Sequence, residues 1–229
     1  MKKYLFCMSI VVIFVLTACE PAVVFENPQP KGAPEEKNFA TPYQGTYLSE
    51  SDSSIVIIDS VCIYKRHWFD FTLSRKRIEK DDNVVKSGEF LHLKNIGKNA
   101  IYRIKNDTVY ASVALEDTLF HLDGSKYILK SHEGHQIMNV KLNEASYQVI
   151  VLSLDGKGNL DLMHASRLED IEKLEKITPT QDISHHDIEQ FMINPTRVEF
   201  DEIMEQEIVF ETYEKFKRIN VRIEDLYPF

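Results

Sequence analysis

The sequence predicts a mainly β fold: an antiparallel meander closed as a barrel or a sandwich, with a small α/β appendage at the C-terminus. Between residues 43 and 165, apolar and polar residues alternate with a period of two, in short runs separated by turns that contain Gly, Asn or Asp. No long helical pattern lies between these runs, so neighbouring strands are expected to be antiparallel. After residue 165 the apolar spacing becomes that of helices.

The composition fits a folded protein and excludes several classes. The chain has 229 residues, of which 43% are hydrophobic, and a net charge of −9. This apolar content is enough for a packed core. The acidic balance lacks the clustered Lys and Arg of nucleic-acid binders, so nucleic acid is not expected as a partner. Three cysteines cannot form a disulfide scaffold, and without a Gly-rich phosphate loop no cofactor is expected.

Residues 1–18 have the layout of a bacterial export signal. Lys2 and Lys3 form a charged start, and the run 4–16 carries no charge. Its 13 residues are fewer than the ~20 that a membrane-spanning helix needs. The following Leu16-Thr17-Ala18-Cys19 resembles the lipobox of bacterial lipoproteins, in which the signal is cut before the cysteine and the cysteine is lipidated. The alternative is a buried N-terminal helix that happens to contain Cys19.

The lipobox resemblance implies a membrane anchor at Cys19. Several acyl chains on one cysteine give lasting attachment, since each buried CH₂ contributes ~0.8 kcal/mol. Glu20 stands where an aspartate retains some lipoproteins in the inner membrane, so we expect the outer membrane, with the folded part facing the periplasm. Surface-exported Bacteroidota lipoproteins often carry an acidic cluster at this point. A single Glu departs from that pattern, and exposure on the cell surface stays an alternative.

Removal of the signal changes the charge and the cysteine count. The chain from residue 19 on keeps 25 basic residues (27 less Lys2 and Lys3) against 36 acidic ones, so its net charge is −11. Cys62 is then the one cysteine without a lipid, and its strand-like surroundings predict a small buried apolar residue. Residues 166–229 hold 16 acidic and 8 basic side chains. This bias indicates a solvated face or, alternatively, a surface for a basic partner or a divalent ion.

Residues 19–42 are expected to form an extended tether, because five of the eight prolines lie there. The antiparallel β domain is expected over residues 43–165, beginning near Tyr43. Its strands are predicted at 44–49, 54–59, 61–73, 89–94, 100–104, 109–114, 118–122, 126–130, 136–142, 147–154 and 160–164.

Residues 166–229 are predicted to form an acidic helical and mixed appendage. A helix is expected over 167–177, with Ser166 and Glu169 as a capping box. A second helix is expected to begin with Pro195 as its first residue. The segment 207–219 fits either a strand or a helix.

Two clusters are candidates for function. His132 and His135 flank a Glu-Gly pair and could begin a metal site, although the same spacing fits a hairpin turn. The aromatic run that contains Tyr64, Trp68, Phe69 and Phe71 could form a ligand platform on one face of a strand, or it could fill a barrel interior. No pattern identifies catalytic residues.

An Asp-hydroxyl-aliphatic pattern occurs at Ser60, Thr108 and Thr118. It fits a turn residue followed by a strand. It also resembles the acceptor motif of the O-glycosylation system of the Bacteroidota, which implies modification of one or more of these hydroxyls if they are exposed.

The order of features over most of the chain resembles a family of uncharacterised Bacteroidota lipoproteins. The residues that carry the resemblance are Cys19-Glu20-Pro21, Pro28-Gln29-Pro30, Tyr43-Gln44-Gly45-Thr46-Tyr47, Asp117-Thr118-Leu119-Phe120 and Ile193-Asn194-Pro195-Thr196-Arg197. The resemblance implies a location in the cell envelope. The sequence therefore favours a non-enzymatic lipoprotein that binds a small apolar ligand or docks on another envelope protein. The alternative is an envelope hydrolase that acts on glycans or lipids through carboxylates that the pattern does not identify.

Overall fold

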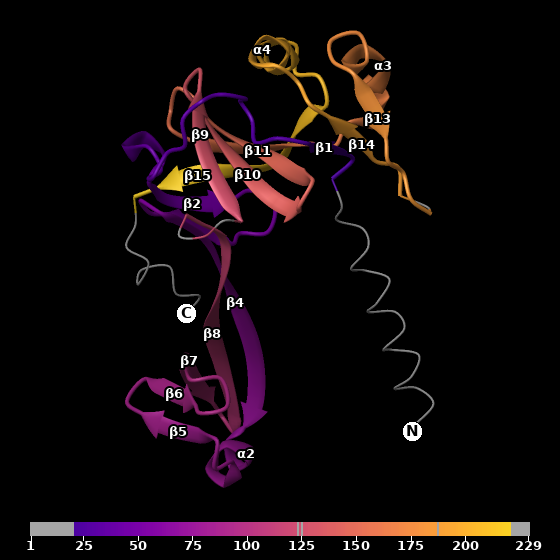
Figure 1. Cartoon of the computed structure of the whole chain (residues 1–229). Helices are drawn as coiled ribbons and strands as arrows, with labels where there is room; N and C mark the ends of the chain where they lie inside the picture. Colours follow the sequence, from indigo (N-terminus) through magenta and orange to yellow (C-terminus); the bar gives the residue numbers. More distant parts are fainter. Residues whose placement is uncertain (1–20, 123, 125, 187, 221–229) are drawn as a thin grey trace. The chain divides into compact units, whose positions relative to one another are not determined.

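The computed structural model describes residues 21–122, 124, 126–186 and 188–220 (Figure 1). Strands make up 53% and helices 13% of these residues, which confirms the mainly β prediction and its small helical part. Fifteen strands belong to one mixed sheet. The predicted closure does not occur among the described strands, because the path ends at β13 (Thr180–Asp182) and β5 (Val84–Ser87) without joining them.

The described residues divide into two compact units, each discontinuous in the sequence. The first unit contains residues 21–37, Gly124–Ser153 and Asp161–Tyr213. The second contains residues 38–122, Leu154–Leu160 and 214–220. Residues on both sides of the boundary expected at residue 165 therefore lie in the same unit.

The first unit combines a small sheet with two helices. Its core strand β1 (Val23–Phe25) runs parallel to β14 (Phe191–Ile193) and antiparallel to β11 (Ser146–Leu154). The hairpin β9–β10 extends the antiparallel part, since β10 also pairs with β11. Its other elements include β9 (Tyr127–His132), β10 (His135–Asn143), β12 (Leu160–Ala165), α3 (Ile171–Leu174), α4 (Arg197–Glu205) and β15 (Phe210–Ile219), of which β11, β12 and β15 also supply residues to the second unit.

The residues expected to form a tether are instead part of the fold. Val23 and Phe25 are fully buried in a core cluster with Phe200, Ile203 and Phe210. Downstream, the Asn139 side chain accepts a hydrogen bond from the Gln29 backbone N–H (2.6 Å) and donates one to its carbonyl (2.9 Å). The proline-rich composition suggested an extended chain, but all three residues of the apolar Val23–Phe25 run are buried, and the run pairs with β11 and β14.

The C-terminal tail differs in detail from its prediction. The expected first helix is a 3₁₀ turn at Leu168–Asp170 followed by the single-turn α3, and no capping bond from Ser166 begins it. Helix α4 begins at Arg197, two residues later than expected, because Thr196 and Glu199 form a reciprocal capping box. The ambiguous segment forms the strand β15.

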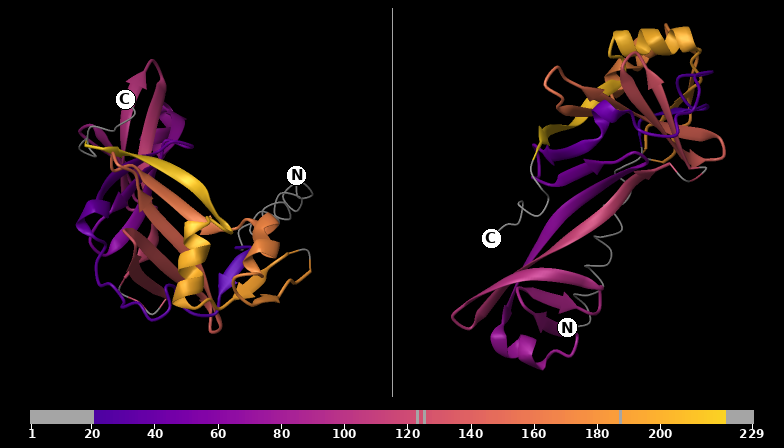
Figure 2. Two further views of the ribbon diagram at one scale, coloured as in Figure 1. Left: turned by 90° about the horizontal axis from the view of Figure 1, so that it is seen from above. Right: turned by 90° about the vertical axis from the view of Figure 1, so that its left-hand side faces the viewer.

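The second unit is an antiparallel series in the order β2-β3-β4-β8-β7-β6-β5. The long strands β4 and β8 pair along their whole length, and they connect β2 and β3 with the small strands β5 to β7 (Figures 1 and 2). Strand β8 is continuous, although two strands were predicted there. The remaining bounds are β2 (Gly45–Ser49), β3 (Ile55–Ile58), β4 (Cys62–Ser74), α2 (Arg75–Lys80), β6 (Phe90–Leu93), β7 (Lys98–Lys105) and β8 (Thr108–His121).

Candidate functional site

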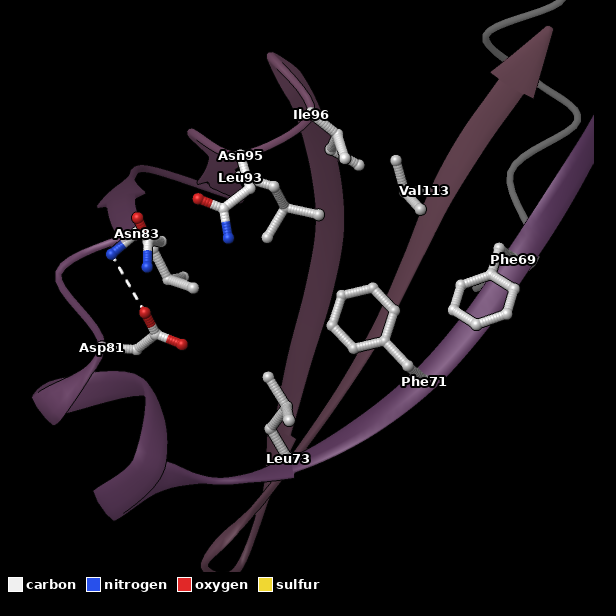
Figure 3. A pocket seen from close by; sticks show the side chains of 10 residues that line it. Phe69, Phe71, Leu73, Asp81, Asn83, Leu93, Asn95, Ile96 and Val113 are labelled. Carbon is white, nitrogen blue, oxygen red and sulfur yellow. Dashed lines mark hydrogen bonds between the residues drawn. The ribbon is translucent and has the colours of Figure 1, made fainter. Parts of the chain in front are cut away.

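An apolar groove lies in the second unit, on the part of the sheet that runs from β4 to β5 (Figure 3). Strands β4 and β5 are separated by β8, β7 and β6 in the pairing order. Side chains from both ends of this series nevertheless line one groove, so this part of the sheet curls. The groove has a volume of about 380 Å³, within the range of about 300–1,000 Å³ typical of small-molecule sites. Its lining residues are Phe69, Phe71, Leu73, Asp81, Asn83, Val84, Leu93, Asn95, Ile96 and Val113.

The alternation of side chains along β4 produces one wall of the groove. Phe69, Phe71 and Leu73 are two residues apart, so they share one face of the strand. The rings of Phe69 and Phe71 stack with their centroids 6.2 Å apart. Tyr64 and Trp68 fall on the opposite face of the same strand and are not among the groove residues. The structure therefore brings two of the four predicted platform residues to the groove.

Groove residues pack against a buried apolar cluster that includes Leu91, Ala100, Val109 and Ala111 and shares Val113 with the groove. Helix α2 contributes its one buried residue, Ile78, to this cluster. The rim is more open, because 56% of Phe69 and 53% of Ile96 are exposed. The groove thus has a packed floor and an apolar rim in contact with water.

One end of the groove is polar. The Asn83 backbone N–H donates to Oδ1 of Asp81 (3.0 Å), and the Val84 N–H donates to the Asp81 carbonyl (3.0 Å), so a tight turn positions this carboxylate. Asn95 lies beside this turn, because the neighbouring Lys94 N–H donates to the Asn83 carbonyl (2.9 Å). Figure 3 shows Asp81, Asn83 and Asn95 together, away from Phe69 and Phe71.

The sequence pattern did not indicate most of the other groove residues. The segment that forms α2 and β5 is rich in charged side chains, and its one helical turn buries a single residue. The Asn-Ile-Gly sequence at residues 95–97 is the one local signal, since Gly97 has a φ of 63° in the turn between β6 and β7.

The sequence His132-Glu133-Gly134-His135 forms the turn of the β9–β10 hairpin. Glu133 and Gly134 have φ values of 48° and 86°, as a two-residue turn of type I′ requires. Nε2 of His132 lies 2.9 Å from Oδ1 of Asp201. Burial lowers the pKa of His135, and the charge of His132 lowers it further. Within the described part of the chain, no group of three or more His, Cys, Asp or Glu residues could hold a metal ion.

The remaining predicted sites lie on different parts of the chain. Ser60 and Thr118 are exposed, whereas Thr108 is half-buried at the start of β8. Asp59 accepts bonds from the N–H groups of residues 61 and 62, so the turn interpretation accounts for the first motif. Cys62 is half-buried. Cys19 lies outside the described residues.

Among the described residues, the arrangement closest to a hydrolytic cluster consists of Ser166, Glu211 and His164. The Ser166 hydroxyl donates to Oε1 of Glu211, which lies 3.9 Å from Nε2 of His164. Burial lowers the pKa of His164. Nucleophilic catalysis requires the hydroxyl to donate to the base, here the imidazole. Because the carboxylate stands between the two groups, Ser166 and His164 do not form a Ser-His pair.

Comparison with known protein families, curated proteins and solved structures finds no match. Among the helices of the described residues, none is both long and apolar enough to cross a membrane.

Proposed function

We propose that this chain is a bacterial envelope lipoprotein, lipidated at Cys19 and held at the outer membrane with its folded part facing the periplasm. The charged start, the short apolar run and the lipobox-like sequence support this proposal. Strand β1 begins four residues after Cys19, at Val23. Since one residue spans at most ~3.6 Å, the anchor would hold the first unit within about 15 Å of the lipid surface.

The lipid anchor can be tested by mass spectrometry. We expect the mature protein to be heavier than residues 19–229 by its acyl groups, and Cys19→Ser to abolish incorporation of a labelled fatty acid. A chain that keeps residues 1–18, or that carries no acyl group, would contradict the proposal. The same spectrum tests O-glycosylation at Ser60, Thr108 and Thr118.

We propose further that the protein is a non-enzymatic module that binds a small apolar ligand in the groove. The observation that carries this proposal is the groove itself: seven apolar side chains surround about 380 Å³ on one sheet face. Phe69 and Ile96 are more than half exposed at its rim. A ligand that covers them removes apolar area from water, which is favourable by roughly 25 cal/mol per Å².

A displacement assay with the apolar dye N-phenylnaphthylamine tests the groove. Phe69→Ser removes an aromatic wall that is 56% exposed, so the fold should tolerate the change. We expect dye affinity to fall about tenfold, as loss of roughly 1.4 kcal/mol of apolar contact implies. Phe90→Ser is the matched control, because Phe90 is 41% exposed and alternates with Leu91, which belongs to the cluster on the groove face, so Phe90 lies on the opposite face. Equal effects of the two variants would contradict the proposal.

The other functions predicted from the sequence require different results. A docking module should be recovered from solubilised envelope with another protein and no small molecule. A hydrolase should turn over a glycan or lipid substrate, and Ser166→Ala should abolish that activity if its cluster were catalytic. We favour ligand binding because the groove, rather than the Ser166 cluster, has the geometry that its chemistry needs.

A further inference from the structure

We propose that the groove binds a single-chain amphiphile, with the alkyl chain along Phe69, Phe71 and Leu73 and an uncharged hydrogen-bonding head beside Asp81, Asn83 and Asn95. This inference rests on the proposed function, because it names the class of ligand for the same groove.

The shape of the apolar part favours a chain over a compact ring. Phe69 and Leu73 are four residues apart on β4, so the row that they begin and end is about 13 Å long. Val84 and Leu93, which are paired across β5 and β6, form the facing wall. A ligand that follows the row of side chains is therefore elongated.

The polar end provides acceptors and donors for a head group. The turn bond from Asn83 uses one of the two carboxylate oxygens of Asp81. The side-chain amides of Asn83 and Asn95 can each donate and accept. A hydroxyl-rich head can form hydrogen bonds with all three side chains. A bare alkyl end would displace the water bound to them and offer no hydrogen bonds in its place.

The charges at this end disfavour an anionic head. Among the described residues that line the groove, Asp81 is the one with a titratable side chain. Lys80, Asp82 and Lys94 are close in the chain but are not part of the lining, and the Lys94 ammonium donates to the Asp82 carbonyl (2.7 Å). The charged group nearest to a head group at this end would therefore be the carboxylate of Asp81, which repels an anion.

Calorimetric titration with two amphiphiles of equal chain length tests the proposal. The protein is the mature unacylated chain, residues 19–229 with Cys19→Ser, and the ligands are decyl glucoside and decanoate below their micellar concentrations. We expect decanoate to bind about fivefold more weakly than decyl glucoside, because its carboxylate would be repelled by the partly exposed carboxylate of Asp81. Asp81→Asn should bring the two affinities within about twofold of each other. This variant keeps the oxygen that accepts the turn bond from Asn83.

Asp70→Asn is the matched control, since Asp70 is exposed on the opposite face of β4, and it should change neither affinity. Asn95→Ala is a second variant, and it should lower the affinity for decyl glucoside about threefold. If both ligands bind equally and Asp81→Asn changes nothing, the ligand class is wrong while the groove remains a binding site. If neither ligand binds, both this inference and the proposed ligand-binding function are overturned. A dimer that dissociates in Phe69→Ser would show that a second copy occupies the groove, which also overturns the inference.

Discussion

Phe25 tests whether the residues that follow the signal belong to the folded protein. Its side chain is fully buried, and its ring centroid lies 6.3 Å from those of both Phe200 and Phe210. Replacement by Ala removes these contacts and leaves a cavity between β1, α4 and β15. Truncation of a buried Phe costs about 3–5 kcal/mol. We therefore expect Phe25→Ala to lower the free energy of unfolding by about 4 kcal/mol, whereas a residue in a tether would contribute nothing.

Urea unfolding followed by circular dichroism measures this loss. Phe90→Ala is the matched control, because Phe90 is 41% exposed and its truncation should cost less than about 1 kcal/mol. The chain has two compact units that can unfold separately, so hydrogen exchange at the β10 and β11 amides should be measured as well. If both variants lost the same small free energy of unfolding, the reasoning would be refuted, and residues 19–42 would be an extended tether as first predicted.

Three further predictions concern the first unit. The Lys173 ammonium donates to the Asp170 carboxylate (2.6 Å) and holds its pKa below the ordinary value. The ion pair therefore stabilises the fold above the unfolded pKa of Asp170, which is about 4, and this contribution is lost as pH falls through the pKa in the folded state. Asp170→Asn should therefore cost about 1–2 kcal/mol in urea unfolding at neutral pH, and that difference should shrink on acidification. Asn139→Leu should leave the Gln29 backbone groups unpaired and cost about 3 kcal/mol, seen as faster hydrogen exchange at Gln29. Gly134→Val should lower the melting temperature through a loss of about 1–2 kcal/mol, because φ is 86° there, although the space around it is open.

The alternation of side chains predicts most of the second unit's strands. It works for β4 because Phe69, Phe71 and Leu73 are spaced two residues apart. It fails for β1, which has three residues, all buried, and so no period to detect. It also divides β8 at residues 115–117, which include the polar Glu116 and Asp117, although this part of the strand pairs with β4 and can stay solvated.

The groove could be predicted only in part from the sequence. Phe69 and Phe71 stand out because two large apolar side chains share one face of a strand. Val84 and Leu93 reach the same groove through the curl of the sheet, which depends on pairing among five strands. Periodicity within a segment carries no information on such distant pairings. The choice between turn and metal site at His132 and His135 likewise required the register of β9 and β10.

The most direct test of the central claim is methyl NMR of the mature unacylated chain titrated with decyl glucoside. We predict that shifts are confined to groove methyl groups, such as those of Leu73, Ile96 and Val113. Val85 is the internal control, since it is exposed and alternates with the groove residue Val84. Shifts as large at Val85, or no shifts at saturating ligand, would contradict the account.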